Sequence, residues 1–120
     1  MYGVPASLDL KPFLGANLQR VDLGIHIIYF HFAMEPVGRI SVEGDWDLVG
    51  PDGRMLDHQQ EPAERDGYRL HVLLGRDVVG YEVSAPEFFS LRFDSGHVLR
   101  IYDHSPEYES FQLEPGGIIV

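Results

Sequence analysis

The chain has no cysteine, which excludes disulfide bonds, thiolate metal sites and cysteine nucleophiles. It also has no apolar run of about eighteen residues, the length that a membrane-spanning helix needs. The longest apolar stretch, 25–34, is interrupted by His26 and His31. The first residues, MYGVPASLDLKPF, have neither the basic nor the apolar segment of a signal peptide. We therefore expect a cytoplasmic protein with no membrane partner.

Basic residues are also scarce. Nine Lys and Arg stand against nineteen Asp and Glu, the formal net charge is −10 at pH 7, and Lys11 is the single lysine. A surface of this sign repels the phosphates of nucleic acid, so we expect no nucleic-acid partner. The acidic balance has two possible explanations. It keeps the protein soluble, or it also speeds the encounter with a basic protein partner.

The residues that are present favour β structure. Glycine and proline recur at short intervals, and the segments between them alternate or run apolar, with many aromatic and β-branched residues. The hydrophobic content of 44% is enough for one folded domain over residues 1–120. We predict a mainly β fold, an antiparallel sandwich or partly open barrel. Its strands are predicted at 17–23, 25–32, 39–42, 45–49, 68–73, 77–83, 88–93, 98–102, 108–113 and 117–120.

A weak internal repeat relates two parts of the chain. LGANLQRVDL (14–23) resembles LGRDVVGYEV (74–83) at an offset of 60 residues. IIYFHF (27–32) then matches FFSLRF (88–93) at an offset of 61. Either an internal duplication or a chance similarity between β patterns explains these matches.

The similarity continues to the end of each half. RISVEGD and HVLRIYD follow a glycine turn, and each half closes with an aromatic-x-Leu and a proline-glycine turn, in WDLVGPDG and FQLEPGG. We predict that the halves, about 14–53 and 74–120, are similar four-strand meanders. Neither can bury its apolar face alone, so the two must pack together.

The segment between the halves is RMLDHQQEPAERDGYRL. Pro62 suits the first turn of a helix, because proline lacks an N–H that would be unpaired there. Gly67 would end such a helix. We predict a short helical turn or loop near residues 58–66.

Alternating carboxylates surround the only tryptophan, in VEGDWDLVG. Glu43, Asp45 and Asp47 offer oxygen ligands of the kind that Ca²⁺ binds, but their spacing does not follow a calcium loop. If Trp46 points into the core, strand alternation turns Asp45 and Asp47 outward. We therefore predict a solvated acidic face here and no metal.

The histidines do not form a recognisable catalytic group. His26 and His31 are five residues apart on one predicted strand, so they face opposite sides and cannot share a metal. One of them is expected to be a hydrogen-bonded core or interface residue. Ser95, His97 and Asp103 have the chemistry of a triad, but a serine and a histidine two apart in a tight hairpin point the wrong way for it. We predict no catalytic residues.

YDHSPEYESFQL, residues 102–113, is the densest polar and aromatic stretch. Glu109 shares its strand parity with Phe111 and Leu113, which look like core residues. A buried carboxylate needs a partner, and Arg92 or Arg100 is expected to supply one, unless a bulge turns the side chain outward. The candidate binding residues of the whole chain are Glu109, Tyr108, Asp103, His104, Trp46, Asp45 and Asp47.

The C-terminal half, LRFDSGHVLRIYDHSPEYESFQLEPGGIIV, resembles a group of small, uncharacterised bacterial proteins. They share two apolar strands around a glycine turn, then Tyr-Glu-(Ser/Ala)-aromatic and a final apolar strand. The resemblance covers about residues 70–120, and Tyr108-Glu109-Ser110-Phe111 is its most distinctive part. In size and charge these acidic proteins are similar to immunity proteins that neutralise toxins. The resemblance implies no catalytic residues.

Two functions are consistent with these features. The first is a non-catalytic protein-binding module, immunity-type or regulatory, with a basic partner and no cofactor. The alternative is a small-molecule-binding β-barrel or minor enzyme that uses histidine and carboxylate groups, with a pocket lined by Tyr29, Phe30, Trp46 and Tyr81. Exposed strand edges and the apolar tail GGIIV also favour pairing across a two-fold axis in a homodimer.

Overall fold

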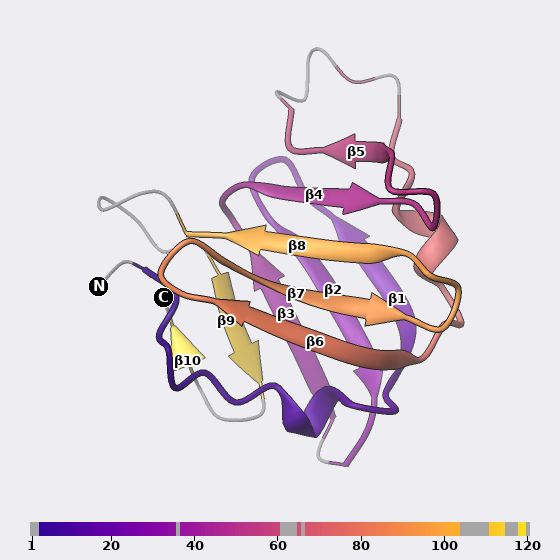
Figure 1. The fold of residues 1–120 in the computed structure, drawn as a ribbon. Helices are drawn as coiled ribbons and strands as arrows, with labels where there is room; N and C mark the ends of the chain where they lie inside the picture. The colour runs from indigo at the N-terminus through magenta and orange to yellow at the C-terminus, as the bar shows by residue number, and fades with distance from the viewer. Residues whose placement is uncertain are drawn as a thin grey trace.

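The structure, a computed structural model, describes residues 3–35, 37–60, 65, 67–103, 111–114 and 118–119. The fold is mainly β, as predicted, with two antiparallel sheets packed face to face (Figure 1). Over the described residues the sheets do not close into a barrel. The elements are η1 (Lys11–Phe13), β1 (Asn17–Leu23), β2 (Ile28–Ala33), β3 (Gly38–Val42), β4 (Trp46–Val49), β5 (Met55–His58), η3 (Leu70–Leu73), β6 (Val78–Ser84), β7 (Phe88–Phe93), β8 (Val98–Tyr102), β9 (Phe111–Glu114) and β10 (Ile118–Ile119).

The two halves exchange their later strands. One sheet has the order β1-β2-β3-β9-β10 and the other β5-β4-β8-β7-β6. In each half only the first three strands form a meander. The fourth strand, β4 or β9, joins the sheet of the other half. A short connection turns the chain through a corner between β3 and β4, which is how strands switch sheets in crossed β packings.

Strand registers relate the two halves position by position. The irregularity in β1 between Leu18 and Arg20 has its counterpart in β6 between Val78 and Gly80, 60 residues later. In the next strands Val21 pairs with Phe30, while Tyr81 pairs with Leu91, so β7 follows β2 at 61 residues. For β3 and β8 the offset is 59 rather than the 58 implied by aligning RISVEGD with HVLRIYD, because Phe30 faces Ile40 and Leu91 faces Leu99.

The same correspondence appears where the edges of the two sheets meet. Gly15 N–H donates to the carbonyl of Val78 at 2.7 Å, and Gly75 N–H donates to the carbonyl of Leu18 at 2.8 Å. Each glycine follows a 3-10 turn and has a positive φ, 82° and 79°, which residues with a Cβ rarely adopt. The two glycines therefore let the chain turn from a 3-10 helix into β1 and β6.

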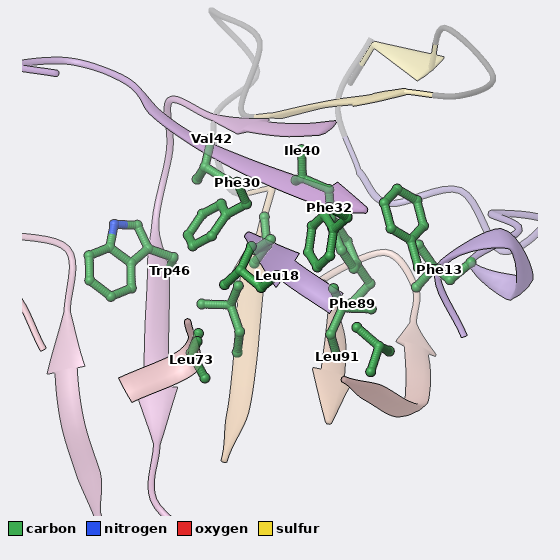
Figure 2. Close-up of a cluster of buried hydrophobic side chains, with 14 of the residues drawn as sticks. Phe13, Leu18, Phe30, Phe32, Ile40, Val42, Trp46, Leu73, Phe89 and Leu91 are labelled. Carbon is green, nitrogen blue, oxygen red and sulfur yellow. The ribbon is translucent and has the colours of Figure 1, made fainter. Parts of the chain in front are cut away.

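One hydrophobic core lies between the sheets, and both halves contribute to it (Figure 2). Phe30 and Ile40 from one sheet meet Phe89 and Leu91 from the other, and all four are fully buried. Trp46, which is 3% exposed, lies at one end of this cluster. The alternation of apolar residues along β2, β3, β7 and β8 therefore supplies the core, as strand geometry requires.

The local structure between the two halves differs from the prediction. Residues 68–73 were expected to be a strand, but Leu70–Leu73 is a 3-10 helix, since its two buried leucines are three residues apart. β5 (Met55–His58) was not predicted. The helical turn near 58–66 falls largely on residues 61–64 and 66, which lie outside the described part of the chain.

Candidate functional site

An open cleft of about 480 Å³ lies at one end of the sandwich. Three separate segments form it: the β1–β2 turn, the corner between β3 and β4, and the segment that follows β5. The described residues that line it are Gly24, Ile25, His26, Ile27, Ile28, Val42, Glu43, Gly44, Trp46, Gln59, Gln60, Arg65 and Tyr68.

The lining combines apolar and polar groups. Ile25 in the β1–β2 turn is 74% exposed, the most exposed large apolar side chain among the described residues. Trp46, at the start of β4, is almost fully buried and contributes a wall. His26 and Glu43 are exposed residues of the same cleft. Two glutamines add further polar groups, so the lining is more polar than that of a typical small-molecule pocket.

Arg65 is held in the cleft wall by two aromatic rings. The carbon of its guanidinium group lies 3.9 Å from the centroid of the Tyr68 ring and 5.4 Å from that of Trp46. The side chain of Arg65 is only 5% exposed. A guanidinium group over aromatic faces gains cation–π attraction that strengthens when water is excluded.

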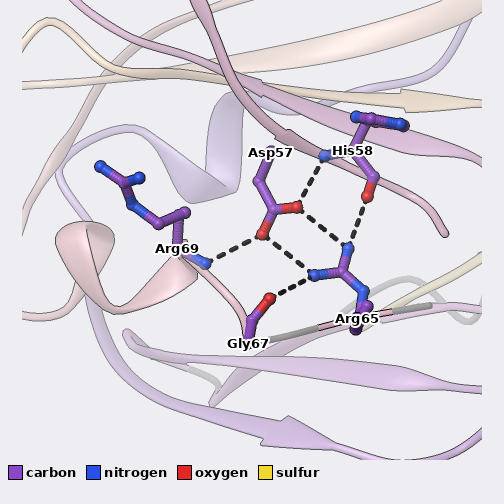
Figure 3. A network of polar contacts seen from close by, with 5 residues as sticks. All are labelled: Asp57, His58, Arg65, Gly67 and Arg69. Carbon is purple, nitrogen blue, oxygen red and sulfur yellow. Dashed lines mark hydrogen bonds and ion pairs between the residues drawn. The ribbon is translucent and has the colours of Figure 1, made fainter. Parts of the chain in front are cut away.

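A buried carboxylate holds the other side of this guanidinium group (Figure 3). Arg65 Nη2 lies 3.0 Å from Asp57 Oδ1, and Arg65 Nη1 lies 3.3 Å from Asp57 Oδ2. The two nitrogens also donate to backbone carbonyls, Nη1 to Gly67 and Nη2 to His58. All four Nη hydrogens therefore have acceptors within the protein, and Arg65 is a structural part of the wall rather than an open anion site.

Asp57 has donors on both carboxylate oxygens. The N–H of His58 donates to Oδ1 at 2.8 Å, and the N–H of Arg69 donates to Oδ2 at 2.9 Å. Burial alone would raise the pKa of Asp57, but the hydrogen bonds from Arg65 and from these backbone groups outweigh burial and lower it below the usual value. The carboxylate stays ionised at neutral pH and fixes the segment between β5 and η3 against the sheet.

The solvated acidic face predicted beside Trp46 is correct for Asp45, which is exposed, and wrong for Asp47. Asp47 is 6% exposed, because the long side chains of its neighbouring strand cover it. Arg100, its cross-strand partner, donates to it through Nε at 2.6 Å and Nη2 at 3.1 Å, and the hydroxyl of Tyr102 donates at 2.8 Å. The hydrogen bond to Asp47 raises the pKa of Arg100, while burial, followed by the bond to Asp47, raises the pKa of Tyr102.

The other predicted binding residues are spread over the molecule. Asp103 is buried, and its carboxylate accepts a hydrogen bond from the N–H of Gly3 near the N-terminus. His104, Tyr108 and Glu109 lie outside the described residues. Of the two arginines offered as partners of Glu109, Arg100 pairs with Asp47. The described candidates therefore lie in three places: Trp46 and Asp45 at or beside the cleft, Asp47 under Arg100 and Tyr102, and Asp103 beside the N-terminal segment.

The predicted pocket lining is largely different from the observed one. Of Tyr29, Phe30, Trp46 and Tyr81, Trp46 alone lines the cleft. Phe30 is fully buried in the core, and Tyr81 is exposed on β6. The residues that hold the cleft wall, Asp57, Arg65 and Tyr68, were not predicted. They come from a stretch without periodic pattern, and only the isolated carboxylate between Leu56 and His58 could have pointed to a buried partner.

The described histidines have local partners or are exposed. His31 is half-buried, and its Nε2 lies 2.9 Å from Asp22 Oδ2, as expected for a hydrogen-bonded histidine. Hydrogen bonds from Arg20 are the largest influence that lowers the pKa of Asp22, to about 2. His26 lies exposed in the cleft lining.

Ser95 and His97 were expected to point away from each other in their hairpin, and this prediction is wrong. The Oγ of Ser95 and the Nδ1 of His97 do meet, at 2.7 Å. The contact lies inside a hairpin turn that is closed by a hydrogen bond from the N–H of Phe93 to the carbonyl of His97. The carboxylate of Asp103, the third member of the imagined triad, binds Gly3 N–H, so the contact belongs to the turn.

The described residues contain no group of three or more His, Cys, Asp or Glu that could hold a metal ion. Nor do they include a helix long and apolar enough to span a membrane. No protein-family model, curated protein or solved structure matches the chain.

Proposed function

We propose that this protein is a non-catalytic binding module, immunity-type or regulatory, and that the cleft beside Trp46 receives part of a protein partner. The observation that carries the proposal is Ile25. Contact of a large aliphatic side chain with water is unfavourable, and this one is 74% exposed at the edge of a cleft. Together with Ile27 and Tyr68 of the lining, it gives the cleft an apolar edge of the kind that a partner covers.

The charge of the chain favours a basic partner. The net charge is −10, and Glu43 and Asp45 are exposed beside the cleft. Complementary charge speeds encounter and selects among partners more than it adds affinity. The likeness in size and charge to immunity proteins is consistent with this kind of partner.

The chemistry of the cleft favours binding over catalysis. Its most deeply buried charged group, Arg65, has the four Nη hydrogens engaged by Asp57, Gly67 and His58. It therefore cannot offer those donors to the developing charge of a transition state without breaking a buried ion pair. What the cleft presents is a mixed surface of apolar, aromatic and polar side chains, with Glu43 as its exposed charge.

Site-specific cross-linking tests the proposal. A photoreactive amino acid is placed at Ile25 in cells of the source organism, and the same amino acid is placed at Val37 as a matched control. Val37 is 72% exposed and does not line the cleft. We expect one protein to cross-link from position 25 and not from position 37. No adduct at position 25, or the same adducts at both positions, would contradict the proposal.

A small-molecule ligand is the second candidate, because a volume of about 480 Å³ falls within the usual range of ligand pockets, roughly 300–1,000 Å³. A thermal-shift screen of metabolites separates the two. A compound that raises the melting temperature of the protein and changes the fluorescence of Trp46 would support the small-molecule candidate. Trp46 is the only tryptophan, so its fluorescence reports the cleft alone.

A further inference from the structure

The space beside the β6–β7 turn is the counterpart of the cleft in the second half, and the chain itself fills it. In the second half, the N-terminal residues Gly3 and Val4 dock between the β6–β7 turn and the end of β8. The N–H of Val4 donates to the carbonyl of Pro86 at 2.9 Å, and the N–H of Gly3 donates to the carboxylate of Asp103. The side chain of Val4 is 2% exposed, so a short peptide segment inserts one apolar side chain there.

The strand registers identify the cleft as the counterpart of that place. Ile28 of the first half corresponds to Phe89 of the second, so the β1–β2 turn, which contains Ile25 and His26, corresponds to the β6–β7 turn. Val42 faces Ile28 as Ile101 faces Phe89, which makes Gly44 the counterpart of Asp103. Ile25, His26 and Gly44 all line the cleft.

Two differences between the places define what the cleft accepts. Gly44 has no carboxylate to receive a backbone N–H, whereas the preceding residue, Glu43, is an exposed carboxylate in the lining. The cleft also has a volume of about 480 Å³ and the ring of Trp46 as a wall, so it accommodates a larger side chain than valine. The charge of Arg65 is already balanced by Asp57, so the unbalanced charge of the lining is negative.

We infer that the cleft binds a short peptide segment of the partner, which inserts a large apolar side chain beside Trp46 and Ile25 and places a lysine or arginine next to Glu43. The inference rests on the proposed function and specifies its partner. The segment docks against the β1–β2 turn as Gly3 and Val4 dock against the β6–β7 turn.

Selection from a phage-displayed library of random eight-residue peptides tests the inference on the full chain. We expect the selected peptides to share one large apolar residue with a Lys or Arg within one or two positions. A synthetic peptide of the selected sequence should change the fluorescence of Trp46 in a saturable way. The titration is repeated at high salt, where screening should weaken binding.

Matched variants connect the peptide to the cleft. Ile25→Ser should weaken the peptide about tenfold or more, because it removes most of an aliphatic contact. Glu43→Gln should weaken it about threefold and reduce its salt dependence. The controls are Val37→Ser and Glu82→Gln, exposed residues outside the cleft, which should stay within about twofold of the parent. Unchanged melting temperatures establish that the variants fold, as expected for exposed side chains.

The outcomes separate the inference from the proposed function. The inference is overturned if the selected peptides share a sequence without a basic residue. It is also overturned if the Ile25→Ser variant binds the peptide as tightly as the parent protein does. If the partner cross-links from position 25 while the library yields no shared sequence, the protein-binding function holds and the peptide mode is wrong. If neither experiment gives binding at the cleft, both are overturned.

Discussion

Two equivalent segments of this protein are held against the sandwich by different physical means. The segment before η1 is anchored by apolar side chains, with Val4, Leu8 and Leu10 at 6% exposure or less. The segment before η3 is anchored by a buried ion pair, Asp57 with Arg65, and by Tyr68. The same backbone arrangement is therefore compatible with either apolar side chains or a buried ion pair, because both hold the segment against the sheets.

The difference has a functional consequence. At the N-terminal segment the apolar side chain of Val4 fills the space beside the β6–β7 turn. At the other segment Arg65 lies in the cleft wall beside Trp46, and the space beside the β1–β2 turn remains an open cleft. Ionic anchoring thus leaves an open cleft, whereas apolar anchoring closes the equivalent space.

The largest expected effect comes from breaking the ionic anchor. Asp57→Ala leaves the guanidinium group of Arg65 buried without its carboxylate, and we expect a loss of about 3–5 kcal/mol in the free energy of unfolding. Urea denaturation measures it. The control is Asp52→Ala, whose pair with Arg54 is exposed and should cost less than about 1 kcal/mol. Equal losses in the two variants would show that the buried pair is not the anchor.

A second ion pair should be weaker because it is less buried. Asp47→Ala removes the partner of Arg100 and of the Tyr102 hydroxyl, but the side chain of Arg100 is 33% exposed and water can solvate it. We expect a loss of about 2 kcal/mol in the free energy of unfolding, below that of Asp57→Ala. Asp94→Ala, at an exposed carboxylate, serves as the control and should change stability by less than about 0.5 kcal/mol. A loss at Asp47 as large as at Asp57 would contradict this ranking.

The apolar anchor is tested by Val4→Ala, which removes two methyl groups from a side chain that is 2% exposed. We expect a loss of about 1–2 kcal/mol in the free energy of unfolding. Ile25→Ala removes more carbon, yet should change stability by less than about 0.5 kcal/mol, because Ile25 is exposed in the free protein. Thermal denaturation of both variants measures the contrast. A larger loss at Ile25 would mean that the cleft is already covered.

The smallest effect is the pH dependence of the ionic anchor. The folded pKa of Asp57 is lowered, so its contribution is complete above the ordinary carboxyl pKa of about 4 and is lost as the pH falls through the folded value. Stability measured from pH 7 down to pH 2 should therefore fall more steeply in the parent than in Asp57→Asn. Parallel curves of stability against pH for the two proteins would show that the partners of Asp57 do not lower its pKa.

Much of the fold could be predicted from local pattern. The strand 17–23 has the predicted bounds, and the aromatic-x-Leu at the end of each half, Trp46 to Leu48 and Phe111 to Leu113, takes equivalent places in β4 and β9. These predictions succeed because strand alternation and β-branched or aromatic composition act over a few neighbouring residues.

The cleft could not be predicted in the same way. Its lining comes from three segments that the crossed fourth strands bring together, and the predicted pocket shared only Trp46 with it. Asp47 was expected in water because alternation says which face a residue takes, not whether Arg100 and Tyr102 cover that face. Asp57 and Arg65 lie in a stretch without periodicity, so their pairing is visible only in the folded chain.

The sequence by itself determined the class of structure and the sign of the surface. An acidic, cysteine-free chain with short alternating apolar segments forms a mainly β fold, because those properties depend on composition and near neighbours. Only the tertiary structure decided that β4 and β9 exchange sheets and that Asp57 is buried against Arg65. It also decided that Ile25 stands over a cleft. Burial and pairing depend on groups that are distant along the chain, and those meet only when the two sheets pack.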